Sequence, residues 1–327
     1  MSLARMRHAP VDLTVVDDPA MLAALKPAWQ SLWFACPGAT PFQSPQWLLP
    51  WWDVFAPGCL QVIAVHEAGV LTGLAPLYRD GSRLRPLGVS LSDYQDILTL
   101  PGSQAVAAMG EAIAAMDASH DCRFDEVAPS ADVLRLAIPG WKEHLERAST
   151  CPQVALSGGI KAAVPRSTLR LLRTAQNRAA RQRDCVILEG DADNALPLIG
   201  ELQRLNRLRH ADSVFADPRV ADFHTAAMPG LVELGVVRLY ALTIAETVAA
   251  VYYGLLHRDR AYAYLSGFDP AFAYESPSAI LLGYAIESAV REGAQVFDFL
   301  RGSEGYKYRW GAQDHFNMRW IATRQNG

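Results

Sequence analysis

The sequence predicts an α/β fold in which two copies of one unit follow each other, over residues 1–155 and 156–327. Three observations predict it. A helix-start motif occurs twice, a pair of apolar strand runs occurs twice at nearly the same distance, and a stretch rich in Gly, Pro and Ser at residues 139–165 separates the copies. We expect each copy to be a mixed, twisted sheet flanked by helices.

Two pairs of similar sequence segments show the repeat. An F-x-x-P motif at residues 42–45 recurs at residues 215–218, an offset of 173 residues. The stretch LQVIAVHEAGVLTGLAPLYR from Leu60 aligns without a gap with VRLYALTIAETVAAVYYGLL from Val237, an offset of 177 residues. Each stretch holds two apolar runs joined at a two-residue hinge, which is a hairpin signal. The four-residue difference between the offsets indicates a loop insertion between helix start and hairpin.

The first copy contains two helix starts and a strand meander. Asp18-Pro19 and Ser44-Pro45 each place a capping residue before a proline, which favours the start of a helix. The second of these helices carries three tryptophans that could stack on a sugar or fill a buried helix face: Trp47, Trp51 and Trp52. Strands are expected at residues 61–66, 70–78, 83–87 and 123–127, and a small-residue helix at residues 104–118.

The second copy predicts a strand, a helix and a further strand in succession. The strand at residues 261–267 is followed by Ser276-Pro277, a helix that ends at Gly293, and an apolar strand at residues 296–300. This order predicts a right-handed crossover with the helix N-terminus beside a strand end. Free amides there, together with Ser276 and Ser278, could bind an anion.

A basic helix is expected between the copies, at residues 166–183. On a helical wheel its arginines gather on one side, and Leu171, Leu172, Ala175 and Ala179 lie on the other. The basic side includes Arg166, Arg170, Arg173 and Arg181. It is either a solvated face or a surface that binds the phosphates of a nucleotide, a coenzyme or tRNA.

Composition excludes several classes of function. The net charge of −4 provides no basic field for DNA. The five cysteines form no C-x-x-C pair, so we expect neither a metal site nor a disulfide framework. The first ten residues lack the apolar core of a signal peptide, and no apolar run is long enough to span a membrane. We therefore expect a cytoplasmic protein, either free or peripheral to the inner face of the membrane.

The stretch at residues 296–310 contains several candidates for catalytic residues close together in the chain. Asp298 lies inside an apolar strand, where a carboxylate is costly unless it is paired or used. It could pair with Arg301 or Lys307 to fix the following loop, or it could serve a site at the strand end.

Several segments match a known family. FQSPQWLLPWWDVF, GVLTGLAPLYR, SDYQDIL and FDFLRGSEGYKYRWG, in this order, resemble the CelD/BcsL-type acyltransferases of the GNAT superfamily, which are relatives of the FemABX-like aminoacyl transferases. The resemblance extends from about residue 39 to residue 320. It implies two tandem GNAT-like folds. It also implies acyl transfer from a thioester or ester to an amine, often in the assembly of cell-envelope polysaccharide.

The acyl donor stays open at this point. Ordinary GNAT enzymes hold the coenzyme A pyrophosphate with a glycine-rich loop, whereas here the helix is approached by FDPAFAYESPSAILLG, with no glycine until Gly283. FemABX-like relatives lack that loop and use aminoacyl-tRNA. Acetyl-CoA or another acyl-CoA, a charged tRNA, and a non-catalytic binding protein of the same fold are therefore the three alternatives.

The resemblance and the needs of acyl transfer assign roles to residues. Asp298 is the expected base, Tyr306 the acid for the leaving group, and Lys307 with Arg301 the cations for an oxyanion or a donor phosphate. Packing in the core is the alternative for Tyr306. Tyr252 or Tyr253 is expected to line the acyl pocket. The acceptor, a glycan precursor or another small amine, could be bound by Asp93, Tyr94 and Asp96, unless they form an exposed turn. His210 is expected at the surface.

Overall fold

The computed structural model describes residues 10–182, 184–209 and 214–325. These residues form two compact units. Unit 1 contains the chain up to Ala148 and again from Phe316, and unit 2 contains Ser149–His315. The predicted division at residues 155 and 156 differs from this one because β16 (Phe316–Arg324) pairs with β8 (Asp121–Val127), so the end of the chain returns to unit 1.

Unit 1 contains two sheets. One has the strand order β1-β3-β4-β7, and the other the order β2-β5-β6-β8-β16-β9. The remaining strands are β1 (Val11–Val16), β2 (Cys59–Leu60), β3 (Val62–Glu67), β4 (Val70–Ala75), β5 (Leu77–Asp80), β6 (Arg83–Pro86), β7 (Leu98–Thr99) and β9 (Trp141–Thr150). The helices are α1 (Pro19–Ala24), α2 (Lys26–Ala35), α3 (Pro45–Phe55) and α4 (Ala105–Ala114), with short 3-10 turns η1 (Pro41–Gln43) and η2 (Asp132–Arg135).

The helices α2 and α3 pack on unit 1 through their tryptophans. Trp29, Trp33 and Trp47 are fully buried, and Trp51 and Trp52 are nearly so. The tryptophans of α3 therefore form a buried helix face, which is the second of the two alternatives that the sequence left open for them.

Unit 2 is built on one sheet with the strand order β10-β15-β14-β13-β12-β11. Its strands are β10 (Gln153–Ala155), β11 (Val186–Glu189), β12 (Val237–Ile244), β13 (Thr247–His257), β14 (Arg260–Phe268) and β15 (Val296–Asp298). Its helices are α5 (Ile160–Ala163), α6 (Arg166–Ala179), α7 (Ala195–Arg209), α8 (Pro218–Glu233), α9 (Pro277–Arg291) and α10 (Gly305–Arg309), with the turns η3 (Val214–Ala216) and η4 (Pro270–Glu275).

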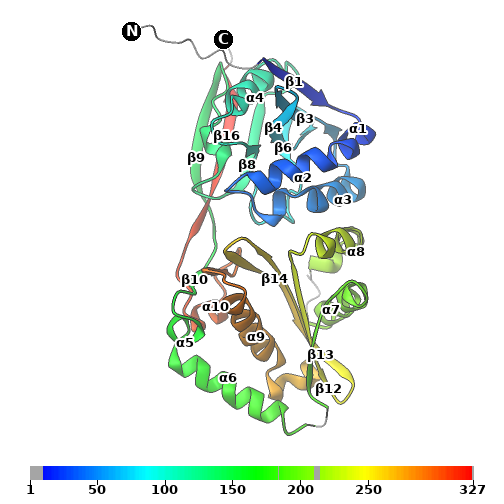
Figure 1. The fold of residues 1–327 in the computed structure, drawn as a ribbon, viewed down its shortest axis with the longest axis vertical. Coiled ribbons are helices and arrows are strands. Elements are labelled where there is room, and N and C mark those ends of the chain that lie inside the picture. Colours follow the sequence, from blue (N-terminus) through cyan, green and yellow to red (C-terminus); the bar gives the residue numbers. More distant parts are fainter. Residues whose placement is uncertain (1–9, 183, 210–213, 326–327) are drawn as a thin grey trace. The chain divides into compact units, whose positions relative to one another are not determined.

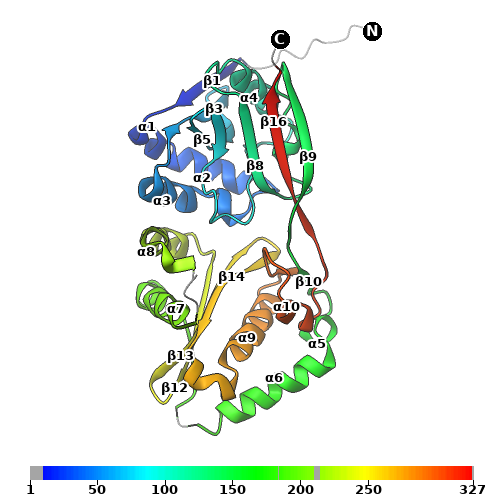
Figure 2. The ribbon, with the colours of Figure 1, turned by 180° about the vertical axis from the view of Figure 1, so that it is seen from behind.

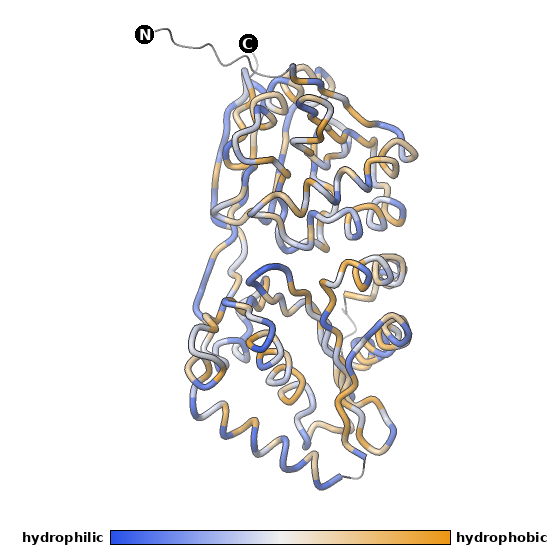
Figure 3. The backbone as a smooth tube through the Cα atoms, in the orientation of Figure 1, coloured by the Kyte–Doolittle hydropathy of each residue, from blue (hydrophilic) through white to orange (hydrophobic). Residues whose placement is uncertain are grey.

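The helices of unit 2 cover both faces of its sheet. Within this unit, α9 lies on one face, and α7 and α8 lie on the other (Figures 1 and 2). Helix α6 runs along α9, and Figure 3 shows its hydrophilic and hydrophobic residues alternating along its length. The Leu172 side chain of α6 sits against Gly283 of α9, where a Cβ would come within 2.6 Å of it. Gly283 therefore sets the close approach of these two helices.

The two predicted hairpins are present, and they share two irregularities. The turn residues Ala68-Gly69 and Ala245-Glu246 all have positive φ, as a type I′ turn requires. The ladder β3–β4 shifts register after Val65, and the ladder β12–β13 shifts after Leu242, its aligned counterpart. A bulge at the same aligned position in both hairpins confirms that the repeat is structural.

The predicted crossover is also present, but its second strand is shorter than expected. Strands β14 and β15 are parallel and pair from Arg260↔Val296 to Tyr262↔Asp298, with α9 between them in the chain. The predicted strand to residue 300 is wrong at its end because Leu300 adopts a φ of 57° and its amide donates to Asp298 Oδ1. Strand β14 continues to Phe268, so its last six residues extend past the end of β15.

Candidate active site

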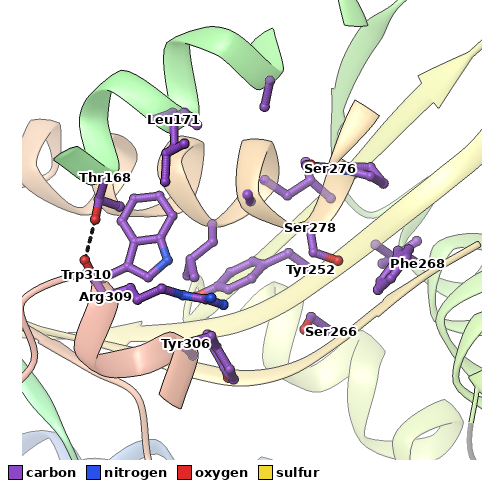
Figure 4. A pocket seen from close by; sticks show the side chains of 18 of the residues that line it. Thr168, Leu171, Tyr252, Ser266, Phe268, Ser276, Ser278, Tyr306, Arg309 and Trp310 are labelled. Atoms are coloured by element: carbon purple, nitrogen blue, oxygen red, sulfur yellow. Dashed lines mark hydrogen bonds between the residues drawn. The ribbon is translucent and has the colours of Figure 1, made fainter. Parts of the chain in front are cut away.

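A pocket of about 650 Å³ opens in unit 2 where β14 extends past β15. Figure 4 shows it lined by α6, by the strands β13 and β14, by the first turn of α9 and by α10. The side chains that surround it are mostly aliphatic or aromatic, among them Leu171, Leu281, Tyr252, Phe268, Phe299 and Trp310. Apolar walls with a few polar groups are typical of a small-molecule site.

The part of β14 that lines this pocket extends past its pairing with β15. The register with β13 passes from Tyr253↔Leu265 to Gly254↔Ala263, so Tyr264 is an extra residue in β14. On its other edge β14 pairs with β15 only as far as Tyr262. Some peptide groups of residues 263–268 are thereby left outside the ladder, and strand amides in such a position can stabilise an oxyanion.

One end of the pocket is suited to an anion. The N-terminus of α9 meets it at Ser276, Pro277 and Ser278, and Ser276 has a left-handed φ of 55°. Arg178 reaches the same end from α6, where its Nη1 donates to the Tyr274 carbonyl at 2.7 Å and its guanidinium lies 4.9 Å from the Tyr274 ring centre. A helix N-terminus and a fixed guanidinium both attract phosphate oxygens.

The other end of the pocket is formed by α10 and the residue after β15. The Phe299 and Tyr306 rings lie 6.2 Å apart, edge to face, and Tyr306, Arg309 and Trp310 all line the cavity. Burial, with a contribution from Glu304, raises the pKa of Tyr306 to about 12. Burial raises the pKa of Tyr252 well above its usual value, helped by Tyr240 and Tyr306. Both phenols therefore stay protonated at neutral pH.

The pocket is positively charged. Its charged lining consists of Arg178 and Arg309, and none of the described residues that line it is Asp or Glu. A ligand with negative groups is therefore favoured at both ends, and no lining carboxylate is available to take a proton from an amine.

The carboxylate of Asp298, the expected base, is held in place by hydrogen bonds from other parts of unit 2. Its carboxylate is fully buried and accepts hydrogen bonds from Gln153 Nε2 at 3.0 Å, Arg260 Nη1 at 3.2 Å and the Leu300 amide at 2.8 Å. Asp298 does not line the pocket. The geometry supports the ion-pair interpretation, and it adds Arg260, from β14, as a partner that the sequence did not suggest.

Lys307 and Arg301, the expected cations, also lie outside the pocket lining. Lys307 is buried, and its Nζ donates to the carbonyls of Leu300, Arg301 and Gly302 at 3.2, 2.7 and 2.9 Å. It also pairs with Glu304 at 2.9 Å. With these acceptors Lys307 holds the turn that follows β15, and Arg301 contributes its carbonyl to that turn.

The two expected pocket tyrosines lie on opposite faces of the sheet. Tyr252 lines the pocket, whereas Tyr253 packs edge-on against His224 and Tyr264, at 5.8 and 5.4 Å between ring centres. Alternate residues of a strand point to opposite faces, so only one of the pair can reach the pocket. Ser276 and Ser278 do lie at the pocket, as the sequence predicted.

The residues expected to bind an acceptor belong to unit 1, and the predicted exposed turn is wrong. Asp93 and Tyr94 are each 6% exposed, and their carbonyls accept from Asn317 and Gln43. Asp96 accepts from the amides of Ile97, Asp132 and Val133 at 2.8 to 2.9 Å. Burial raises the pKa of Asp96 to about 7 against these hydrogen bonds. All three residues thus support the fold of unit 1.

The arginines of α6 divide between solvent and pocket. Arg170 and Arg173 are exposed on the basic side, as predicted, and neither lines the pocket. Arg178 does, because on the helical wheel it lies at the border of the apolar side that carries Leu171 and Ala175. Sequence reasoning missed Arg178, Arg309 and Trp310 as pocket residues, and the position of Arg178 beside the apolar stripe was the signal that could have found it.

The described residues contain neither a metal-binding cluster nor a helix that could span a membrane. Within residues 10–182, 184–209 and 214–325, no group of three or more His, Cys, Asp or Glu side chains is placed to hold a metal ion. No helix in the same residues has the length and apolar character needed to cross a bilayer. His210 lies outside the described residues.

Comparison with known proteins finds a family model that resembles most of unit 2. Residues 166–308 match the family described as Acetyltransferase (GNAT) domain. The solved structure of FemX is 12% identical with a TM-score of 0.63, over 94% of this chain and 96% of FemX. A conserved protein of unknown function from Bacteroides thetaiotaomicron is 14% identical with a TM-score of 0.61, over 96% and 100%. L-PGS from Bacillus licheniformis is 12% identical with a TM-score of 0.59, over 95% and 93%.

No curated protein matches the chain. At these identities the structural likeness concerns the fold, and it spans nearly the whole chain. The predicted class of two α/β units with mixed sheets and flanking helices is confirmed. The GNAT domain in unit 2 supports an acyltransferase.

Proposed function

We propose that this chain is an N-acyltransferase that moves an acyl group, acetyl in the simplest case, from an acyl-CoA held in the unit 2 pocket to an amine. The observation that carries the proposal is the pocket itself. It lies where β14 extends past the end of β15, within the GNAT match, and one end presents Arg178 and the start of α9. The phosphates of the coenzyme would bind at that end, where Arg178 serves in place of a glycine-rich loop.

The reaction places the thioester beside Tyr306 and the edge of β14. The amine nitrogen attacks the thioester carbon, and amides of residues 263–268 stabilise the oxyanion. The C–N bond forms, the C–S bond breaks, and Tyr306 gives its proton to the departing sulfur. Tyr306 then takes a proton back from water, which restores the phenol. Because the pKa of Tyr306 is raised to about 12, the phenol is protonated and able to donate across the physiological range.

The proton lost by the amine passes to water in this scheme. Asp298 is fully buried and occupied by three donors, and no described lining residue is a carboxylate. We therefore propose that the acceptor reacts from its neutral form. The rate then rises with pH until the amine is deprotonated, and the apparent pKa changes from one amine acceptor to the next. A single pKa common to chemically different amines would indicate a base supplied by the protein.

The acceptor and the cellular setting rest on the resemblance to CelD/BcsL-type enzymes. That resemblance favours an amino sugar in a cell-envelope polysaccharide precursor and a cytoplasmic protein, peripheral to the inner face of the membrane if the precursor is lipid-linked. An amine-acylation screen with released thiol as the readout can identify the acceptor class. A donor that binds but is never consumed with any amine would favour the third alternative, a non-catalytic binding protein.

Titration calorimetry with coenzyme A tests the donor. The wild type should bind, and Arg178→Gln should weaken binding by about tenfold, the effect of losing one charge-assisted contact. Arg207→Gln is the matched control, because Arg207 is exposed on α7, away from the pocket. Absence of heat with millimolar coenzyme A and the wild type contradicts the proposal.

A second candidate is an aminoacyl transferase that uses charged tRNA. The observation that favours it is the exposed basic side of α6, which carries Arg166, Arg170 and Arg173. Under this alternative, Arg170→Glu together with Arg173→Glu abolishes tRNA binding, and wild-type affinity falls steeply with salt. Coenzyme A binding that depends on Arg178, with tRNA affinity insensitive to these reversals, removes this candidate.

A further inference from the structure

Arg309 is a second cation of the pocket, and it lies away from the end that is proposed to bind the phosphates. It follows Tyr306 by three residues in α10, and both side chains line the cavity. In Figure 4 the Arg309 side chain extends into the pocket from α10, at the end that holds Tyr306 and Trp310. This is the end where the proposed chemistry takes place.

The two pocket arginines are held far apart by α6. The Thr168 hydroxyl donates to the Arg309 carbonyl, and Arg178 lies ten residues further along the same helix. Ten helical residues rise about 15 Å. Arg178 and Arg309 therefore mark opposite ends of the pocket wall, with the apolar residues Leu171, Leu172 and Ala175 between them. A phosphate group bound at Arg178 leaves Arg309 free for a different anion.

Arg309 has no anion of its own in the described part of the chain. Its backbone carbonyl accepts from the Thr168 hydroxyl, and its guanidinium makes no ion pair or hydrogen bond with a described residue. Its lining neighbours Tyr306, Trp310 and Phe299 supply no negative charge at neutral pH. A guanidinium in such surroundings is suited to a carboxylate, which it can bind with two parallel hydrogen bonds.

We propose that Arg309 binds a carboxylate carried by one of the reacting molecules, which makes it the residue that selects an acidic substrate. The carboxylate has two possible sources: the acyl group of the donor, as in a dicarboxylic acyl thioester, or an amino-acid acceptor. This inference rests on the proposed function. It deepens that function by adding a second charged group, at the end of the pocket away from the phosphates, to the ligand set.

The donor arm of the test compares two thioesters that differ in one carboxylate. Succinyl-CoA and butyryl-CoA have acyl chains of the same length, and calorimetry gives their affinities for the wild type and for Arg309→Gln. If the donor carries the carboxylate, the wild type prefers succinyl-CoA by about tenfold and Arg309→Gln loses that preference. Arg309→Lys keeps a charge but not the paired hydrogen bonds, so it should show an intermediate preference. Arg207→Gln should retain the wild-type ratio.

The acceptor arm measures thiol release from acetyl-CoA with amino acids and with the matching amino-acid amides. If the acceptor carries the carboxylate, the wild type favours the acids, and Arg309→Gln removes the difference. Coenzyme A binding with no carboxylate preference in either arm, or with a preference that survives in Arg309→Gln, overturns this inference and leaves the proposed function standing. A wild type that does not bind coenzyme A overturns both.

Discussion

The substitution Asp298→Asn tests whether the carboxylate of Asp298 has a structural role or a catalytic one. Asparagine has nearly the same shape as aspartate, so the substitution removes the charge and little else. In the structure the carboxylate is fully buried at the end of β15 and receives hydrogen bonds from Gln153, Arg260 and Leu300. The asparagine side chain can keep the Leu300 amide on its carbonyl oxygen, but its NH₂ group then faces two donors. The variant therefore loses the bonds to Gln153 and Arg260.

The expected cost follows from these two bonds. Hydrogen bonds to a charged group contribute about 1.5–3 kcal/mol each, and an unsatisfied buried donor adds to the loss. Arg260 is 33% exposed, so water compensates for part of its lost partner. We expect Asp298→Asn to destabilise the protein by about 2–4 kcal/mol. The folded fraction should retain its rate of acyl transfer, because Asp298 does not line the pocket.

Urea unfolding and acyl-transfer kinetics on the same preparations provide the measurement. Asp314→Asn is the control, because Asp314 is an exposed carboxylate of the same segment that accepts from the Tyr308 hydroxyl. Its stability should stay within about 0.5 kcal/mol of the wild type. A variant Asp298→Asn with wild-type stability and a rate reduced by about 100-fold or more would refute the structural role and restore Asp298 as the base.

Three further predictions concern the acid, the turn and the buried histidine. Tyr306→Phe should lower kcat by about 100-fold with little change in the KM for the donor, because the phenol acts on the departing sulfur. An equal loss of kcat with a donor whose leaving group needs no proton would contradict that role. Lys307→Met should cost about 2–4 kcal/mol in urea unfolding, because it leaves three turn carbonyls without their donor; an unchanged midpoint would show that the turn does not need this cation. Burial lowers the pKa of His224 to about 3, so the unfolded chain binds a proton that the folded chain does not between about pH 6.5 and pH 3. Stability should therefore fall as the pH is lowered through this window, by about 1.4 kcal/mol per pH unit from this group. His224→Phe, whose ring suits the neighbouring Phe223 and Tyr253, should remove that part of the slope, and an identical slope in both proteins would contradict it.

Local sequence signals were sufficient for most elements of unit 2. Apolar runs around a two-residue hinge predicted β12 and β13, and a serine before a proline predicted the start of α9. The end of β15 was not predictable in this way. Leu300 has a side chain typical of a strand, and it leaves the strand because Asp298 accepts its amide and Lys307 binds its carbonyl.

The candidate site depended on packing that a single sequence does not encode locally. Asp298 is close to Arg301 and Lys307 in the chain, but it also accepts hydrogen bonds from Gln153 and Arg260, which the sheet brings to it from 145 and 38 residues away. Likewise, the sequence offered the arginines on the basic side of α6 as candidates for an anion site, and Arg178 was not among them. The rotation of α6 is fixed by Leu172 against Gly283, and this contact is what turns Arg178 to the pocket.

A crystal structure with bound acetyl-CoA can show whether unit 2 holds an acyl-CoA where β14 extends past β15. We expect pyrophosphate density at Arg178 and the first turn of α9, with the thioester beside Tyr306 and the edge of β14. Coenzyme density that avoids this pocket, or that leaves Arg178 on Tyr274 with no phosphate near it, would show that unit 2 does not bind the donor in this way.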